Sequence, residues 1–207
     1  IATGYDRLSV ARVRAQAAGT PPVDGRPPGF VVVARLVPEK NVAGALDAYA
    51  TYRRLCATHG QVPAGLTILG DGPLREDLAA RAQGVAGVRF AGFVGPETVA
   101  GTLARAHALL LPSWREPWGL AVNEAVALGV PVLASTAVGA AETLVQEGVS
   151  GRLLAPGDPP AWGRAMHRLT AEPEVRARLA TGSARLAPWA DVGGFVDGVG
   201  WLSERLA

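Results

Sequence analysis

The sequence predicts an α/β protein with a Rossmann-like parallel sheet, helices on both faces of that sheet, and a helical C-terminal extension. Short β-rich apolar runs alternate with longer stretches of helical composition, a pattern typical of βαβ units. The runs are apolar at successive positions, as in strands that are buried on both faces. After residue 158 the composition is helical throughout. The 207 residues, 49% of them hydrophobic, suffice to bury the core of one domain.

The expected elements follow each other regularly along the chain. Runs such as FVVVAR and LTIL are short and apolar, so they suit strands. We expect strands at 30–35, 66–69, 88–91, 108–111, 130–134 and 151–154, and helices near 41–59, 73–83, 96–106, 119–128 and 139–147. Pro173 and Pro188 should break the helical extension, because proline cannot continue a helix.

Changes in composition divide the chain into three parts. Residues 1–29 are a leader of helical composition followed by GTPPVDGRPPG, which is typical of a linker. Residues 30–187 are the sheet domain. Residues 188–207 are an amphipathic helical tail with Trp189 and Trp201, expected to dock on its own domain, although a surface for a partner is the alternative. Because the chain begins at Ile1, we expect it to be part of a longer protein.

Charge and composition exclude several classes of function. The net charge of +2 arises in the leader and the remainder is balanced, so no basic stripe is available for nucleic acid. Cys56 is the only cysteine, which excludes a disulfide framework and favours a reducing compartment. The histidines lack metal-ligand spacing and the sequence has no Asp-x-Asp motif, so we expect no metal site.

The most apolar window, residues 119–141, is long enough to suggest a membrane-spanning helix. Glu124, Gly129 and Pro131 interrupt it, so we interpret it as a helix, a turn and a buried strand. We therefore expect no transmembrane segment and a cytoplasmic location. Any peripheral attachment to the inner face of a membrane would come from a domain outside this chain.

The first candidate binding residues lie after the first expected strand, since ligands bind at the carboxyl ends of strands in an open parallel sheet. Arg35 ends that strand, and Lys40, the only lysine of the chain, falls where the next helix should start. A cation there is unfavourable unless an anion lies between it and the helix. Arg35 and Lys40 therefore predict a diphosphate site, although a solvated surface lysine would also explain Lys40.

Two glycine-containing turns follow later strands, and each is a weak signal by itself. Gly70 and Asp71 begin GDGP, a tight turn without the third glycine of a dinucleotide fingerprint. A turn without any binding role explains GDGP equally well. Phe93 and Val94 lie in FAGFVG, whose open backbone suits the edge of a flat heterocycle.

The segment PSWREPWGLAVNEAVALGVPV carries two glutamates around an expected helix start. Gly119 and Leu120 offer N–H groups to an anion. Glu124 lies among apolar residues, where a carboxylate needs donors such as sugar hydroxyls, although a solvated helix edge is the alternative. A glycosidase is disfavoured because the helix would separate Glu116 and Glu124 by up to ~12 Å, whereas hydrolase carboxylates lie roughly 5 to 9.5 Å apart.

In order and spacing, several segments resemble the C-terminal, donor-binding domain of retaining GT-B glycosyltransferases of family 4, the glycosyl transferases group 1. The segments are ARLVPEKN, GDGP, FAGFV, LLPSWREPWGLAVNEAVALGVPVLAS and LVQEGVSGRLLAPGD, within about residues 30–190. The most specific element is Glu116-x7-Glu124 with Arg35 and Lys40 upstream. The sequence VGAAETL departs from the family's glycine-glycine-x-proline-glutamate run, although Glu142 matches its acid.

The resemblance implies a role for each site residue. Arg35 and Lys40 would neutralise the diphosphate as the leaving group departs, and with Glu116 they are the catalytic candidates. Glu116 would hold hydroxyls of the donor sugar, and Glu124 those of the ribose. The other donor-binding candidates are Gly70, Asp71, Trp118, Gly119, Leu120, and, beside the base, Phe93 and Val94.

The resemblance also implies a function. The chain would bind a nucleoside-diphosphate sugar, of UDP or GDP, without a metal or other cofactor. With a missing N-terminal domain it would transfer the sugar, with retention, to a hydroxyl of a saccharide, lipid-linked or small-molecule acceptor. Alone, it should bind a nucleoside diphosphate weakly and transfer nothing. A non-catalytic nucleotide-sugar-binding or scaffolding module remains the alternative, as does a GT-B epimerase; a phosphorylase is disfavoured because the single lysine already has a role.

Overall fold

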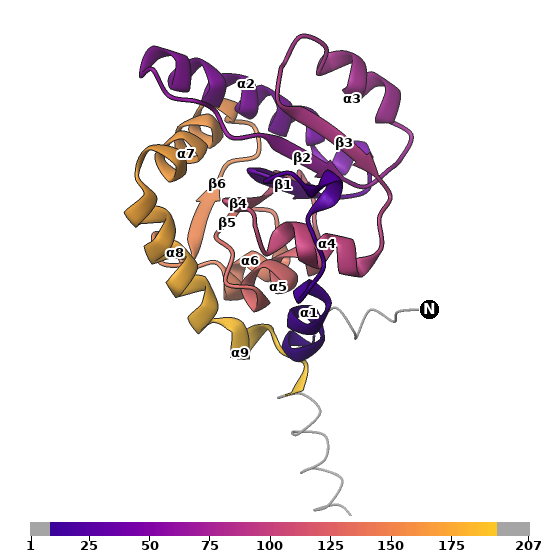
Figure 1. Ribbon diagram of the computed structural model, residues 1–207, viewed down its shortest axis with the longest axis vertical. Helices are drawn as coiled ribbons and strands as arrows, with labels where there is room; N and C mark the ends of the chain where they lie inside the picture. Colours follow the sequence, from indigo (N-terminus) through magenta and orange to yellow (C-terminus); the bar gives the residue numbers. More distant parts are fainter. Residues whose placement is uncertain (1–8, 194–207) are drawn as a thin grey trace, which may run out of the picture.

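The computed structural model describes residues 9–193, and in this range one parallel sheet of six strands forms the centre of the molecule (Figure 1). β1 and β2 pair in a regular register, with Phe30 opposite Leu66 and Val33 opposite Leu69, whereas the register between β2 and β3 shifts between Ile68 and Leu69. The strand order is β3-β2-β1-β4-β5-β6. The chain adds β2 and β3 on one side of β1 and then returns to add β4, β5 and β6 on the other side, so the strand order reverses between β1 and β4. The strands are β1 Phe30–Val33, β2 Leu66–Leu69, β3 Val88–Gly92, β4 Ala108–Leu111, β5 Val132–Ser135 and β6 Gly151–Leu154.

Helices cover both faces of the sheet, so the predicted Rossmann-like fold is confirmed. Side chains of successive strand residues point to opposite faces: Phe30 and Val32 pack with α2, α3, α7 and α8, and Val31 packs with α4, α5, α6 and α9. Figure 1 shows α2 and α7 on one side of the strands and α4 and α5 on the other. The helices are α1 Val10–Ala17, α2 Val42–Thr58, α3 Arg75–Arg81, α4 Pro96–Leu103, α5 Leu120–Ala127, α6 Gly139–Leu144, α7 Pro159–Ala171, α8 Pro173–Arg185 and α9 Ala187–Ala190.

Prolines set several element boundaries. Pro131 has no N–H for the strand ladder, so β5 begins at Val132 instead of residue 130 as predicted. Pro173 and Pro188 lie in the first turns of α8 and α9, where the backbone N–H would have no helical partner anyway. They divide the helical extension as expected, and they do so by starting new helices.

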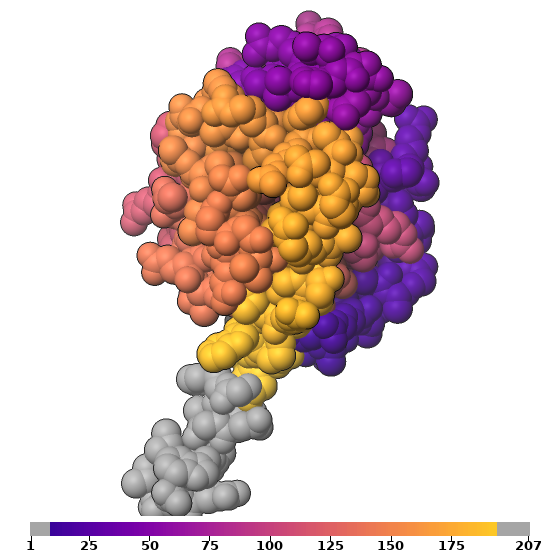
Figure 2. All heavy atoms as spheres, turned by 90° about the vertical axis from the view of Figure 1, so that its left-hand side faces the viewer, coloured from indigo at the N-terminus to yellow at the C-terminus, as the bar shows by residue number. Residues whose placement is uncertain are grey.

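The leader forms α1 and packs against the sheet domain. Val13 is buried against α4 and α5, and Arg14 Nε donates a hydrogen bond to the carbonyl of Ala127 (2.8 Å). The N–H of Val10 donates to Asp191 Oδ2 (2.9 Å), so the first and last described segments lie side by side at one pole, as Figure 2 also shows. The boundary that we place at residue 29 stays a prediction.

The C-terminal tail is described only as far as residue 193. Within that part Trp189 is 73% exposed, whereas Trp201 and most of the predicted amphipathic helix lie outside the described residues. Across residues 9–193 no helix has the length and apolar character needed to cross a membrane. Residues 119–141 form α5, a turn, β5 and the start of α6, in agreement with the prediction.

His107, just before β4, makes the free energy of unfolding depend on pH. Its Nδ1 atom is buried without a hydrogen-bond partner in the described part of the chain. Burial, and to a smaller extent the charge of Arg176, lowers the pKa of His107 from 6.5 to about 4. Between these pH values the unfolded chain binds a proton that the folded protein does not, so the free energy of unfolding decreases as the pH falls.

We expect His107→Phe to weaken this loss of stability, since the variant has no group to titrate at this position. Urea denaturation at about pH 7 and about pH 5 measures the difference for each protein. His167 serves as a comparison: burial also lowers its pKa, but the residue is only partly buried, so His167→Gln should change the response less. An undiminished pH response in His107→Phe would contradict the assignment.

Candidate functional site

A cavity of about 990 Å³ lies at the carboxyl ends of the strands, at the reversal of strand order between β1 and β4. Ligands of open α/β sheets bind at this position. The loops after β1, β2, β3 and β4 and the first turn of α5 form its walls. The structure brings all eleven predicted site residues around it: Arg35, Lys40, Gly70, Asp71, Phe93, Val94, Glu116, Trp118, Gly119, Leu120 and Glu124.

The loops after β1 and β2 touch each other through their backbones. β1 ends at Val33 instead of residue 35 as predicted, yet the main-chain bonding continues beyond it, with the N–H of Leu36 donating to Asp71 O (2.9 Å). At Gly70 φ is 140°, and an added Cβ would lie 1.9 Å from the carbonyl oxygen of Ala34. Only glycine fits there. Close approach of two backbones therefore explains why GDGP carries a glycine at this point.

Lys40 does not start the helix, contrary to the prediction. It ends a 3-10 turn, Pro38–Lys40, and Asn41 in the left-handed region (φ 50°) separates this turn from α2. Asn41 Oδ1 accepts a hydrogen bond from the first turn of α2 (3.2 Å), and Nδ2 donates to the carbonyls of Pro112 and Pro156 (3.0 Å each). Asparagine is a preferred N-cap residue, so Asn41 itself is the signal in the sequence that marks the start of α2.

Lys40 and Glu116 form an ion pair across the cavity, with 2.5 Å between Nζ and Oε2. Their side chains are 21% and 14% exposed, so both charges are largely withdrawn from water. The two residues were predicted to hold different parts of one ligand, whereas in the structure each neutralises the other. Arg35 is exposed and its guanidinium has no hydrogen-bond or ion-pair partner within residues 9–193, so it can meet an anion without losing another contact.

The backbone of Glu116 is anchored to the loop after β5. Its N–H donates to the carbonyl of Ala137 (3.1 Å), and its own carbonyl accepts from the N–H of Gly139 (3.0 Å). These two bonds belong to an isolated parallel bridge between Glu116 and Val138. The carboxylate is thus positioned by a main chain that is fixed on the β5 side.

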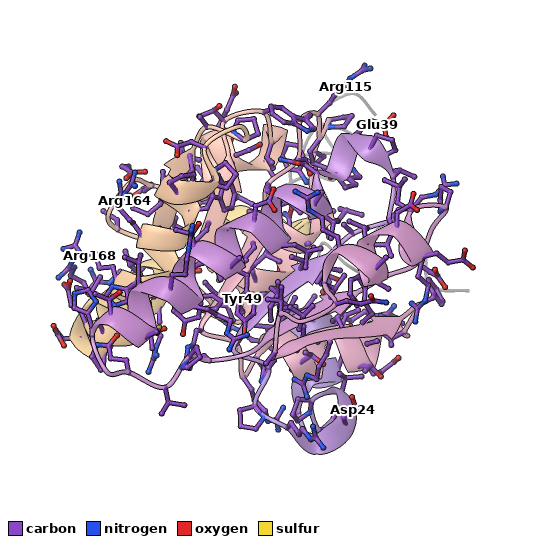
Figure 3. All side chains as sticks on the ribbon, turned by 90° about the horizontal axis from the view of Figure 1, so that it is seen from above. Asp24, Glu39, Tyr49, Arg115, Arg164 and Arg168 are labelled. Carbon is purple, nitrogen blue, oxygen red and sulfur yellow. The ribbon has the colours of Figure 1, made fainter. Side chains whose placement is uncertain are left out.

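The same segment also contacts the loop after β1. The N–H groups of Trp114 and Arg115 both donate to the carbonyl of Glu39, at 2.8 and 3.4 Å. Figure 3 shows Glu39 and Arg115 together at one edge of the molecule, with the Arg115 side chain directed away from the protein. The segment that carries Glu116 therefore joins the ends of three strands, β1, β4 and β5.

Helix α5 begins at the cavity. Gly119, with φ 101°, precedes Leu120, and no side chain caps this end of the helix. The N–H of Val122 donates to the carbonyl of Gly119 (2.8 Å), whereas the N–H groups of Leu120 and Ala121 precede the first helical hydrogen bond and carry the positive end of the helix dipole. Glu124, one turn further along, is 3% exposed and still lines the cavity. Its apolar surroundings agree with the sequence analysis.

The loop after β3 gives the cavity an apolar wall. Phe93 is 86% exposed, and Val94, Pro96 and Val99 continue the surface. An exposed aromatic ring beside aliphatic side chains suits contact with a flat ring. The sequence analysis did not identify Pro96 and Val99, because apolar residues at a helix start carry no signal that separates a binding role from a place in the core.

The charged side chains of the cavity are two cations, Arg35 and Lys40, and three acids, Asp71, Glu116 and Glu124. An anion would therefore depend on the two cations and on the N–H groups of α5. In the part of the chain that the structure describes, no group of three or more His, Cys, Asp or Glu side chains could hold a metal ion. Glu142 is exposed on α6 and does not line the cavity.

The chain is similar to proteins of a known family. The family described as Glycosyl transferases group 1 matches residues 27–172. A curated relative from Nocardioides, a D-inositol 3-phosphate glycosyltransferase, is 41% identical over 105 residues, which are 49% of this chain and 23% of the relative. A Mycobacterium tuberculosis relative, a GDP-mannose-dependent alpha-(1-6)-phosphatidylinositol dimannoside mannosyltransferase, is 35% identical over 157 residues, 75% of this chain and 39% of the relative.

Solved structures share the fold over almost the whole chain. HepE of Anabaena in complex with UDP has a TM-score of 0.73 at 22% identity, covering 98% of this chain and 54% of that protein. Sucrose-phosphate synthase of Thermosynechococcus elongatus has a TM-score of 0.73 at 25% identity, covering 96% of this chain and 49% of that protein. This chain thus spans about half of these structures and at most about two fifths of these curated relatives.

The close approach at Gly70 predicts a large loss of stability for Gly70→Ala, because the added methyl group would clash with the Ala34 carbonyl and the backbone conformation would be strained. We expect a loss of about 3 kcal/mol in the free energy of unfolding, measured by urea denaturation. Gly84→Ala is the matched control: φ is +78° and nothing lies within 4 Å of an added Cβ. Its loss should be about 1 kcal/mol, the cost of a side chain in the left-handed region alone. Equal losses would contradict a backbone clash.

Proposed function

The chain belongs to the family Glycosyl transferases group 1, and from this premise we propose that it is the donor-binding domain of a GT-B glycosyltransferase. It binds a nucleoside-diphosphate sugar in the cavity at the carboxyl edge of the sheet. The observation that carries the proposal is the gathering of all eleven family-matched residues around that one cavity. HepE of Anabaena, which shares this fold, was solved in complex with UDP, and this supports a nucleotide as the ligand.

The diphosphate is bound by Arg35, Lys40 and the start of α5. Arg35 presents a planar fork of donors and Lys40 a point charge, while the first N–H groups of α5 add partial positive charge. Together they compensate the negative charge that develops on the diphosphate as the sugar leaves. The reaction proceeds with retention and without a metal ion.

Donor binding changes the partner of Lys40. In the structure its Nζ atom is paired with Glu116. A diphosphate carries more negative charge than one carboxylate, so Lys40 turns toward it and Glu116 becomes free to accept hydrogen bonds from hydroxyls of the sugar. Glu124 accepts from the ribose hydroxyls, and the base lies against Phe93 and Val94.

The acceptor is held by a domain outside this chain, and the greater length of the relatives leaves room for one. That acceptor is a hydroxyl of a saccharide, a lipid-linked sugar or a small molecule. Without such a domain the chain binds nucleotide and transfers nothing. The protein acts in the cytoplasm, and any contact with the inner face of a membrane is made by the other domain.

Titration calorimetry with UDP, GDP and ADP tests the diphosphate site. We expect one of the three to bind, and Lys40→Ala and Arg35→Ala each to weaken that binding about 10- to 100-fold, as for the loss of a charged hydrogen-bond partner. Arg164→Ala is the matched control, because Arg164 is an exposed arginine of α7 outside the cavity (Figure 3), and it should bind like the wild type. No heat with any of the three nucleotides would count against the proposal and favour a scaffold.

Glu116→Gln tests whether Glu116 competes with the diphosphate for Lys40 or holds Lys40 in position for it. The variant removes the carboxylate that competes for Lys40 and repels a diphosphate, so we expect several-fold tighter binding of the nucleoside diphosphate. The sugar should add less affinity in the variant than in the wild type, because glutamine accepts hydrogen bonds less strongly than a carboxylate. If Glu116→Gln weakens nucleotide binding as much as Lys40→Ala does, Glu116 positions Lys40 and the exchange of partners is wrong.

A further inference from the structure

Asn123 is a buried polar residue of α5 that the proposed reaction does not use. Its side chain is 3% exposed, and both ends of its amide are occupied. Oδ1 accepts a hydrogen bond from Trp118 Nε1 (2.8 Å), and Nδ2 donates to the carbonyl of Ala190 (3.1 Å). An indole N–H can only donate and a carbonyl can only accept, so these two partners fix the orientation of the amide.

The first partner, Trp118, belongs to the cavity wall. It lies between Glu116 and Gly119, lines the cavity, and keeps 45% of its surface exposed. Its carbonyl accepts from the N–H of Ala140 (2.8 Å), which fixes the backbone. An exposed tryptophan on a fixed backbone can still adopt several rotamers. The bond from Nε1 to Asn123 selects the one in which the edge of the indole faces α5.

The second partner, Ala190, ends α9, which packs on α5. Asn123 therefore connects a side chain of the cavity wall with a segment that is 67 residues later in the chain. If α9 moved, the amide would lose an acceptor in a buried position, which is costly. The orientation of the indole and the docking of α9 consequently support each other.

We propose that Asn123 is a positioning residue for the sugar end of the donor. It holds the Trp118 indole beside Glu116, so that the ring forms a fixed wall against the sugar, and it makes this wall dependent on the docking of α9. The inference rests on the proposed donor site and adds to it a residue that does not touch the ligand. A wall beside the sugar should affect the nucleoside-diphosphate sugar more than the nucleoside diphosphate alone.

The test compares two ligands by calorimetry: the nucleoside diphosphate that binds among UDP, GDP and ADP, and its glucose or mannose derivative. For Asn123→Leu and for Trp118→Phe we expect affinity for the nucleotide sugar to fall about 3- to 10-fold, the range for loss of one hydrogen bond. Affinity for the nucleoside diphosphate should change by less than about twofold. Trp118→Phe alters a half-exposed residue, so it remains informative if Asn123→Leu fails to fold.

The double variant gives a second readout. Because both substitutions break the same bond, Trp118→Phe with Asn123→Leu should lose no more affinity than either single variant. Val126→Ala is the matched control, since Val126 is fully buried in α5 and does not line the cavity. It should lower stability and leave the ratio of the two affinities unchanged.

The possible results distinguish a failure of the proposed donor site from a failure of the proposed role of Asn123. If the wild type binds neither ligand, the donor site itself is wrong. If the wild type binds both ligands but the variants, like Val126→Ala, keep the wild-type ratio of the two affinities, Asn123 has only a structural role. Additive losses in the double variant would likewise overturn a shared function of Asn123 and Trp118.

Discussion

The ion pair between Lys40 and Glu116 joins the loops that leave β1 and β4, the two strands on either side of the reversal of strand order. Removing two charges from water is costly unless each finds a partner, and in this protein each is the partner of the other. The pair therefore neutralises both charges where the two loops meet, and both of its members are binding residues in the proposed function. A ligand that offers phosphate to one residue and hydroxyls to the other exchanges contacts without leaving a buried charge alone.

Much of the fold could be predicted because its signals are local. Short β-rich runs identified each strand, although β3 and β6 each include an arginine, Arg89 and Arg152, and proline positions marked the divisions of the helical extension. The C-terminal end of β1 and the place of Lys40 were misjudged because they depend on contacts across the sheet. Leu36 bonds to Asp71 in the next loop, and the Asn41 cap reaches residues after β4 and β6. No window of sequence contains both members of such a pair.

The sequence predicted which residues surround the cavity, but not how their side chains pair with one another. Strand topology brings the loop residues to one edge once the sheet is parallel, so their shared cavity follows from the fold. The pairing of Lys40 with Glu116, however, depends on side-chain reach, and Asn123 was overlooked because its partner Ala190 is remote in sequence. The predicted residues belong to motifs that are visible in the sequence, whereas the bonds of Asn123 to Trp118 and Ala190 are visible only in the structure.

The side chain of Asn41 ties the turn after β1 to the carbonyls of Pro112 and Pro156. Neither bond involves a cavity residue, so both survive when a ligand enters. These bonds hold the main chain of the rim in place, so the proposed ligand would be bound by rotation of a few side chains. In the proposed function, the entropic cost of binding a nucleotide is confined to those rotamers, so little of the binding free energy is lost to ordering the site.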